Sequence, residues 1–153
     1  YGNVFDCAYN HYCIVKQAYI RGLNSILIIE DDIMFNSNQE KIQEIFNKMP
    51  QEYDIIKFYN TYNANSEQNK IKDLCFINKS NAAFYKYVLS TLCYALSRKG
   101  MELVINEYEK NFGASDVILE RIQMNNYIND KFFVLTYNAL CMPINDKSNI
   151  VYK

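Results

Sequence analysis

The sequence lacks several features that would assign the protein to a class at once. Basic and acidic residues nearly cancel, with 16 Lys and Arg against 17 Asp and Glu, so the net charge of -1 gives no support for a nucleic-acid partner or for binding an anionic membrane surface. No apolar run approaches the roughly 20 residues of a membrane-spanning helix, and no segment has the pattern of a signal peptide. We therefore expect one globular domain over residues 1–153 with a substantial core, since half of the residues are apolar.

The cysteines contain no CxxC pair, which is the spacing of many metal-binding and thiol–disulfide motifs. They are odd in number and lie in apolar surroundings, at Cys7, Cys13, Cys75, Cys93 and Cys141. Such scattered residues are typical of reduced, buried thiols in a protein of the cytoplasm. We accordingly expect a cytoplasmic location and no disulfides.

The most informative stretch is 26–32, in which four aliphatic residues run directly into three carboxylates. The aliphatic part predicts a strand over 26–31 that is buried on both faces, because it is apolar without alternation. Side chains alternate along a strand, so Glu30 and Asp32 would share one side and Asp31 would face the other. Carboxylate oxygens suit a hard divalent ion such as Mn²⁺ or Mg²⁺, which makes this pair a candidate metal site. A solvated acidic strand end remains the alternative interpretation.

Apolar periodicity predicts helices and strands in alternation along the rest of the chain. The predicted helices cover 3–21, the region from a capping box at Ser37 to Pro50, 98–111 after Ser97, and the region from Ser115 onwards. The predicted strands cover 53–59, 74–78, 84–89, 92–96 and 132–137, although 84–89 could instead form a helical turn. A polar loop is expected at 60–72 and an extended tail at 144–153. This alternation is typical of an α/β domain with a parallel sheet.

Three further residues could carry chemistry. His11 is the only histidine and lies on the apolar face of the first predicted helix, which favours a hydrogen-bonded core position. Asp116 lies in the first turn of its predicted helix, where the helix dipole favours an acid, so it has a purely structural explanation too. Glu120 follows one turn later and can share its face.

Several short segments carry a resemblance to one protein family. They are Cys-Ala-Tyr-Asn-His at 7–11, Ile-Ile-Glu-Asp-Asp-Ile at 28–33, Tyr-Asp-Ile-Ile-Lys at 53–57, Tyr-Ala-Leu-Ser-Arg-Lys-Gly at 94–100, Ser-Asp at 115–116, Pro143 and Ser-Asn-Ile at 148–150. In this order they resemble the motifs of glycosyltransferase family 25, the lipopolysaccharide-biosynthesis and collagen-galactosyltransferase group. The match to its Glu-Asp-Asp motif is close. Asp6, Asn10 and Asn149 depart from the family pattern.

The resemblance implies an α/β fold of the GT-A type, a Rossmann-like mixed sheet flanked by helices. The family's first strand and helix are missing before the His11 segment, so we expect a chain truncated at its amino end. The implied activity is transfer of a sugar, with galactose the first choice, from a UDP-sugar to a surface glycan such as lipopolysaccharide, with inversion. We expect no nucleic-acid partner, and we consider peripheral contact with the inner face of a membrane.

The resemblance also implies roles for the candidate residues. Asp32 would bind Mn²⁺ or Mg²⁺ directly, and Glu30 would bind the ion through water or hold the ribose. Asp31 and His11 complete the candidate donor-binding set. Asp116 would deprotonate the acceptor hydroxyl, with Glu120 as the second candidate.

Two other functions stay open at this point. A degenerate, non-catalytic relative that keeps the fold would act as a binding module. A phosphoryl-transfer or receiver-type acidic pocket would need a further Asp at a later strand end and a Lys beyond it. Asp54 begins its predicted strand rather than ending it, which argues against that pocket.

Overall fold

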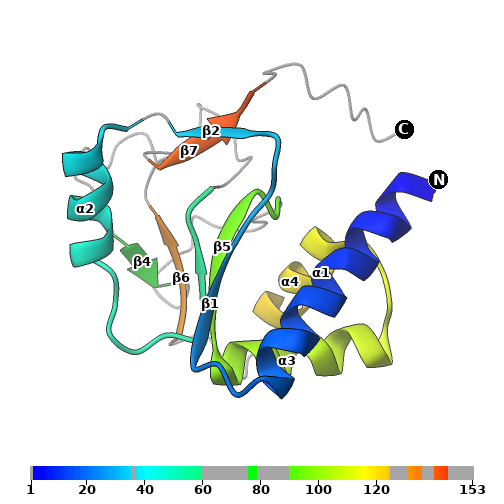
Figure 1. Ribbon diagram of the computed structural model, residues 1–153. Helices are drawn as coiled ribbons and strands as arrows, with labels where there is room; N and C mark the ends of the chain where they lie inside the picture. The colour runs from blue at the N-terminus through cyan, green and yellow to red at the C-terminus, as the bar shows by residue number, and fades with distance from the viewer. Residues whose placement is uncertain are drawn as a thin grey trace.

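The computed structural model of the protein describes residues 2–35, 37–59, 76–78, 90–124, 131–135 and 140–144, which form an α/β fold (Figure 1). Their helices are α1 (Gly2–Ile20), α2 (Gln39–Asn47), α3 (Arg98–Lys110) and α4 (Ser115–Met124). Their strands are β1 (Ser25–Ile29), β2 (Ile33–Phe35), β3 (Ile55–Lys57), β4 (Phe76–Asn78), β5 (Cys93–Ser97), β6 (Phe132–Leu135) and β7 (Cys141–Pro143). None of the described helices combines the length and apolar character needed to cross a membrane.

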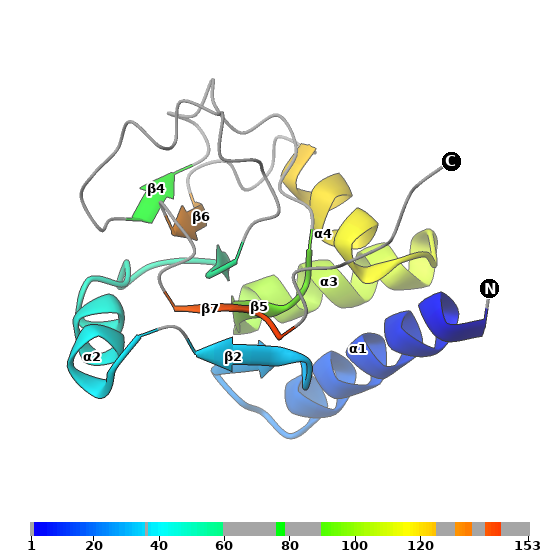
Figure 2. The same ribbon diagram turned by 90° about the horizontal axis from the view of Figure 1, so that it is seen from above.

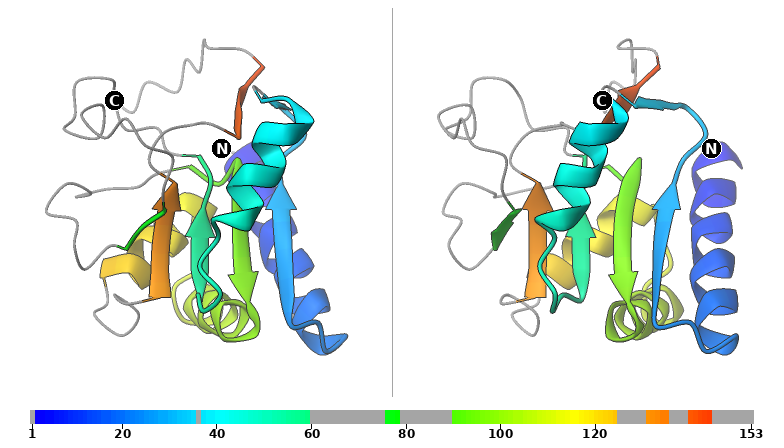
Figure 3. Two further views of the ribbon diagram at one scale, coloured as in Figure 1. Left: turned by 90° about the vertical axis from the view of Figure 1, so that its left-hand side faces the viewer. Right: turned by 60° about the vertical axis from the view of Figure 1, so that its left-hand side comes forward.

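The main sheet is mixed, as the resemblance implies, with the strand order β1-β5-β3-β6-β4. β5 runs antiparallel to both of its neighbours, β1 and β3, whereas β3 and β6 are parallel. The prediction of a simple parallel sheet is therefore wrong, because β5 inserts in the opposite direction between β1 and β3. Even so, β1, β3 and β6 all point the same way, and their carboxyl ends meet at one edge (Figure 3).

Helices cover the two faces of this sheet unequally. α1, α3 and α4 pack together on one face, and α2 lies on the other (Figures 1 and 2). The core under the three helices includes Ile28, Ile55, Tyr94, Leu96, Phe132 and Val134 from the strands. The core under α2 includes Ile45, Ile56, Phe58, Cys93, Ala95 and Leu135.

β1 is an edge strand, and its burial differs from the prediction. Ile28 faces the three helices and is buried, whereas Leu27 and Ile29 face the other side and are each 42% exposed. α2 packs on the central strands and leaves this part of the sheet open. An uninterrupted apolar run therefore did not indicate burial on both faces here. The strand also ends at Ile29, before the carboxylates.

The predicted helix ends are largely confirmed. Gly22, with a positive φ of 76°, ends α1, where Leu23 N–H donates to the Ala18 carbonyl at 3.1 Å and Gly22 N–H to the Tyr19 carbonyl at 3.0 Å. Ser97 caps α3 by accepting the Gly100 N–H. α4 begins at Ser115 as predicted.

The cap of α2 is one residue later than predicted. Asn38, rather than Ser37, is the N-cap, and its side-chain oxygen accepts the Lys41 N–H at 2.9 Å. Both residue types are good caps, so the sequence alone did not distinguish them.

A short antiparallel ribbon of β2 and β7 was not predicted at all. It pairs Ile33 with Pro143 and Phe35 with Cys141, and it lies beyond the edge where β1 and β3 end (Figure 1). Three-residue strands carry too little periodicity to be found from sequence. The predicted loop at 60–72, the strand at 84–89 and the tail at 145–153 lie outside the described residues.

Candidate functional site

The three consecutive carboxylates lie where β1 passes into the β2–β7 ribbon. Glu30 directly follows the strand and is half-buried, and Asp31 and Asp32 form an exposed turn before β2. The Asp32 carbonyl accepts the Ile144 N–H at 2.8 Å, which ties the turn to the end of β7. Since β1 ends at Ile29, strand alternation does not set the direction of these side chains. The metal-binding roles of Glu30 and Asp32 remain predictions.

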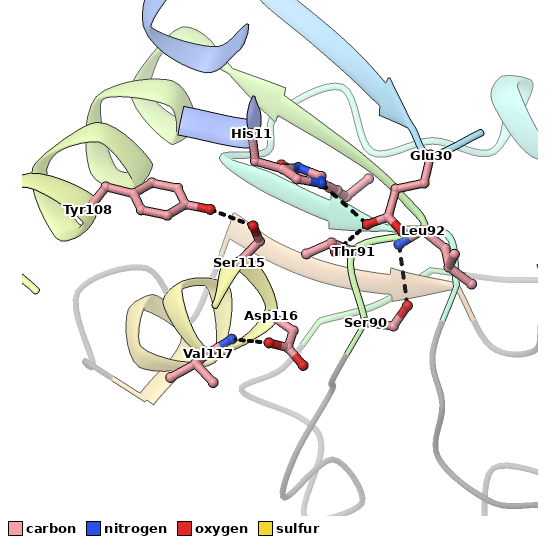
Figure 4. A network of polar contacts seen from close by, with 10 residues as sticks. His11, Glu30, Ser90, Thr91, Leu92, Tyr108, Ser115, Asp116 and Val117 are labelled. Atoms are coloured by element: carbon pink, nitrogen blue, oxygen red, sulfur yellow. Dashed lines mark hydrogen bonds and ion pairs between the residues drawn. The ribbon is translucent and has the colours of Figure 1, made fainter. Parts of the chain in front are cut away.

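Glu30 is held by groups from two other elements (Figure 4). Its Oε1 lies 3.3 Å from His11 Nε2 on α1 and accepts a hydrogen bond from the Thr91 hydroxyl before β5. Its backbone N–H donates to the Leu92 carbonyl at 2.9 Å. Burial opposes ionisation of Glu30, but the contacts with His11 and Thr91, with the attraction of Lys57, outweigh it and lower the pKa. Glu30 is therefore a fixed, ionised carboxylate.

His11 occupies the core position that its helix face predicts. It is 5% exposed, and its Nδ1 lies 2.8 Å from the Tyr94 hydroxyl on β5. The two rings are stacked with centroids 5.8 Å apart. Burial raises the pKa of Tyr94 well above its ordinary range, so this hydroxyl keeps its proton. A neutral His11 can thus accept from Tyr94 and donate from Nε2 to Glu30.

Cys7 on α1 is within electrostatic reach of carboxylates that follow β1 and of one on α4. The pKa of the Cys7 thiol is raised, first by burial and then by the negative charges of Glu30, Asp116 and Asp32. Cys7 is nevertheless exposed, which corrects the prediction that all cysteines are buried, whereas Cys93 and Cys141 are buried as expected. The site therefore gathers negative charge and is open at Cys7.

α4 brings the two candidate bases to the same region. Asp116 lies in its first turn and is half-buried, and its Oδ1 accepts the Val117 N–H at 2.8 Å (Figure 4). Ser115 beside it accepts a hydrogen bond from the Tyr108 hydroxyl at 2.7 Å, which fixes the start of the helix against α3. Glu120, one turn later, is also half-buried. The structure places both carboxylates without selecting one as the base.

Lys57 belongs to this site and was not singled out from the sequence. It is the last residue of β3, is 1% exposed and pairs with Tyr94 of β5, so it faces the three helices. Burial lowers the pKa of Lys57 to about 7, and attraction to Asp116, Glu120 and Glu30 limits the shift. The sequence did contain a signal for this residue, because a single lysine inside the apolar run 55–58 is unusual and buried lysines are rare.

Ser90 and Thr91 were also missed. Ser90 has a φ of 91°, a conformation uncommon for residues other than glycine, and it directly precedes the hydroxyl that binds Glu30. Backbone strain of this kind is often found at functional sites. A single sequence gives no signal for a backbone angle at a serine.

The comparison with known proteins agrees with the motifs. A search of curated proteins finds no match to the chain. The model of the family described as glycosyltransferase family 25 (LPS biosynthesis protein) matches residues 5–119. That range contains the candidate residues on α1, after β1 and at the start of α4. With most of its length matched, the chain belongs to glycosyltransferase family 25.

Proposed function

We propose that the protein transfers a sugar from a UDP-sugar to a surface-glycan acceptor of the lipopolysaccharide kind, with inversion at the anomeric carbon. The observation that carries the proposal is the acidic turn of Glu30, Asp31 and Asp32 directly after β1, in which Glu30 is held by His11 of α1 and by Thr91. This turn lies at the edge where β1, β3 and β6 end, and ligands of open α/β sheets bind at such edges. The family membership supplies the class of reaction.

The donor set suits a hard cation. Asp31 and Asp32 are exposed carboxylates in one turn, and Glu30 is an ionised carboxylate beside them. Mn²⁺ and Mg²⁺ prefer oxygen ligands of this type. Asp32 and Glu30 would hold the ion. When bound, it would act as a Lewis acid that offsets the charge developing on the departing diphosphate.

Other residues of the chain would supply the base, compensate charge and position Glu30. Asp116 is the proposed base that takes the proton of the acceptor hydroxyl, and Glu120 is the alternative on the same helix. Lys57 is attracted by Asp116, Glu120 and Glu30, so its protonated form would partly compensate their charges before substrate binds. His11 and Thr91 fix Glu30 so that little reorganisation is required when the donor binds.

We also propose that the described elements are part of a GT-A-type domain. Their mixed sheet with helices on both faces is compatible with that fold. Acceptors of the lipopolysaccharide kind are built at a membrane, so peripheral contact with its cytoplasmic face accompanies the proposal.

Calorimetric titration with UDP tests the proposal at the level of binding. UDP should bind in the presence of Mn²⁺ and lose most of its affinity when EDTA is added. Asp32→Asn should weaken binding about tenfold or more, because it removes one charged ligand. Glu52→Gln, an exposed carboxylate before the start of β3 and so at the opposite end of the strands, is the matched control and should leave UDP binding unchanged.

The same titration addresses the binding-module alternative. Glycan binding without UDP binding, under conditions where Mn²⁺ is present, would favour that alternative and contradict the proposal. UDP binding that is indifferent to both Mn²⁺ and Asp32→Asn would contradict the metal role.

A further inference from the structure

A second constellation with metal-ligand chemistry lies inside the fold, beside the acidic turn. In the part of the chain that the structure describes, Cys7, His11 and Glu30 each offer one ligand atom, and these atoms lie within 4.8 Å of one another. Cys7 and His11 are four residues apart on α1, so they share one face of the helix. Glu30 meets them from the end of β1.

We propose that Cys7, His11 and Glu30 form a zinc-binding site. Thiolate, imidazole and carboxylate are the ligands that zinc takes in proteins, whereas Mn²⁺ and Mg²⁺ prefer oxygen alone. A thiolate and a carboxylate together balance the charge of the divalent ion. Three protein ligands leave a fourth position for water, as in zinc sites with an open coordination position.

Two of the three ligand atoms already have the spacing that this ion requires. His11 Nε2 and Glu30 Oε1 are 3.3 Å apart. Two ligands about 2.0 Å from a tetrahedral metal are separated by about 3.3 Å, so these two side chains need almost no movement. The Cys7 Sγ lies within 4.8 Å of a ligand atom of each of the other two residues, so it has to move closer to complete the site.

The buried His11 and the half-buried Glu30 already have the outer contacts that metal ligands usually possess. His11 Nδ1 lies 2.8 Å from the Tyr94 hydroxyl, and Glu30 accepts from Thr91. On binding, the thiol proton of Cys7 leaves to solvent. The His11 proton then resides on Nδ1, which donates to the Tyr94 oxygen, while Nε2 binds the metal. Such contacts orient the imidazole and raise metal affinity.

The proposed zinc site is distinct from the hard-cation site at Asp32, although both use Glu30. It depends on a sulfur and a nitrogen ligand that the sugar-transfer proposal does not require. Its test therefore uses metal binding alone, with no substrate and no activity readout. Failure of the sugar-transfer proposal would leave the zinc proposal standing. Failure of the zinc proposal would likewise leave the sugar-transfer proposal standing.

Titration of the metal-free protein with Co²⁺, a spectroscopic substitute for zinc, tests the site directly. The wild type should show a thiolate-to-cobalt charge-transfer band at one equivalent, and Zn²⁺ should displace it. Cys7→Ser should lose the band, and Cys13→Ser, on the same helix but outside the cluster, should keep it. Tyr94→Phe should keep the band but weaken affinity about 10-fold or more, because it removes the contact that orients His11.

Three outcomes would overturn the proposal. The first is a wild-type protein that binds Co²⁺ without a thiolate band or does not bind it at all. The second is a band that persists in Cys7→Ser, and the third is a band lost in Cys13→Ser. Cys7 is exposed, so its replacement by serine leaves the core unchanged and a negative result cannot be attributed to unfolding.

Discussion

His11 Nε2 lies 3.3 Å from Glu30 Oε1, and this contact joins the middle of α1 to the residue that follows β1. The other nitrogen of the same ring faces the Tyr94 hydroxyl on β5 at 2.8 Å. One buried side chain thus links a helix to two neighbouring strands of the sheet. It also sets the position of the first carboxylate in the Glu-Asp-Asp motif.

Replacing His11 should cost stability. His11→Ala leaves the Tyr94 hydroxyl and the half-buried Glu30 carboxylate with fewer partners, so the free energy of unfolding should fall by about 1–3 kcal/mol or more. Urea unfolding measures this loss. Asn10→Ala, on an exposed position of the same helix, is the control and should change stability by less than about 0.5 kcal/mol. Equal losses in the two variants would mean that the network contributes nothing specific.

Gly100 should not tolerate even a methyl group. A Cβ at this position would overlap with the Asp54 carbonyl oxygen and approach its carbonyl carbon to 2.9 Å, because α3 begins directly against the residue before β3. Ser97 N–H donates to that same carbonyl at 3.0 Å, which holds the backbone there. Gly100→Ala should therefore destabilise the protein by about 1–3 kcal/mol or more.

Gly113→Ala is the matched control for this prediction. Its nearest neighbour would be the Asn111 carbonyl oxygen at 3.9 Å, an ordinary contact. Thermal unfolding of both variants provides the comparison. A Gly100→Ala protein as stable as Gly113→Ala would show that the close approach does not exist in solution.

Lys57 should make stability depend on pH. The unfolded lysine keeps its proton up to about pH 10.5, whereas the folded one loses it near 7. Between these values the unfolded state binds more protons, so the free energy of unfolding rises with pH, by at most roughly 1.4 kcal/mol per pH unit. The cost of burying a charged lysine is present below pH 7 and is relieved as the pH rises.

Lys57→Met should remove this rise, measured by urea unfolding between about pH 7 and pH 9. Lys110→Met, at an exposed lysine near the end of α3, should retain the wild-type slope. The same slope in Lys57→Met and the wild type would refute the assignment.

Asp116 and Glu120 can be separated by kinetics once a sugar acceptor is in hand. Asp116→Asn should lower the rate of transfer about 100-fold or more while leaving donor binding within a few-fold, because it removes a general base. Glu120→Gln, one turn away, should retain most of the rate. The opposite pattern would assign the base to Glu120 instead.

The sequence predicted much of the fold because local signals were strong. The caps at Ser97 and Gly22 and the start of α4 at Ser115 follow from side-chain and backbone preferences that act over a few residues. The edge position of β1 and the reversed direction of β5 depend on pairing between distant segments. No local pattern encodes that pairing.

In the candidate site, too, some residues could be identified from the sequence and others only from the structure. Glu30, His11 and Asp116 were identified from the sequence, and the structure brings them to one region. Thr91 was not singled out, and Tyr94 and Lys57 lie in motif segments but were given no role, because their contacts with the site residues appear only in three dimensions. Lys57 alone left a signal, as a charge inside an apolar strand.

The most direct test of the central claim is UDP release by the purified protein incubated with UDP-galactose and related UDP-sugars. We predict release that requires Mn²⁺, stops with EDTA, and falls about 100-fold in Asp32→Asn, since the cation stabilises the leaving diphosphate. The outcome that would contradict the account is the absence of release from every UDP-sugar in the presence of Mn²⁺, or release at the wild-type rate in Asp32→Asn.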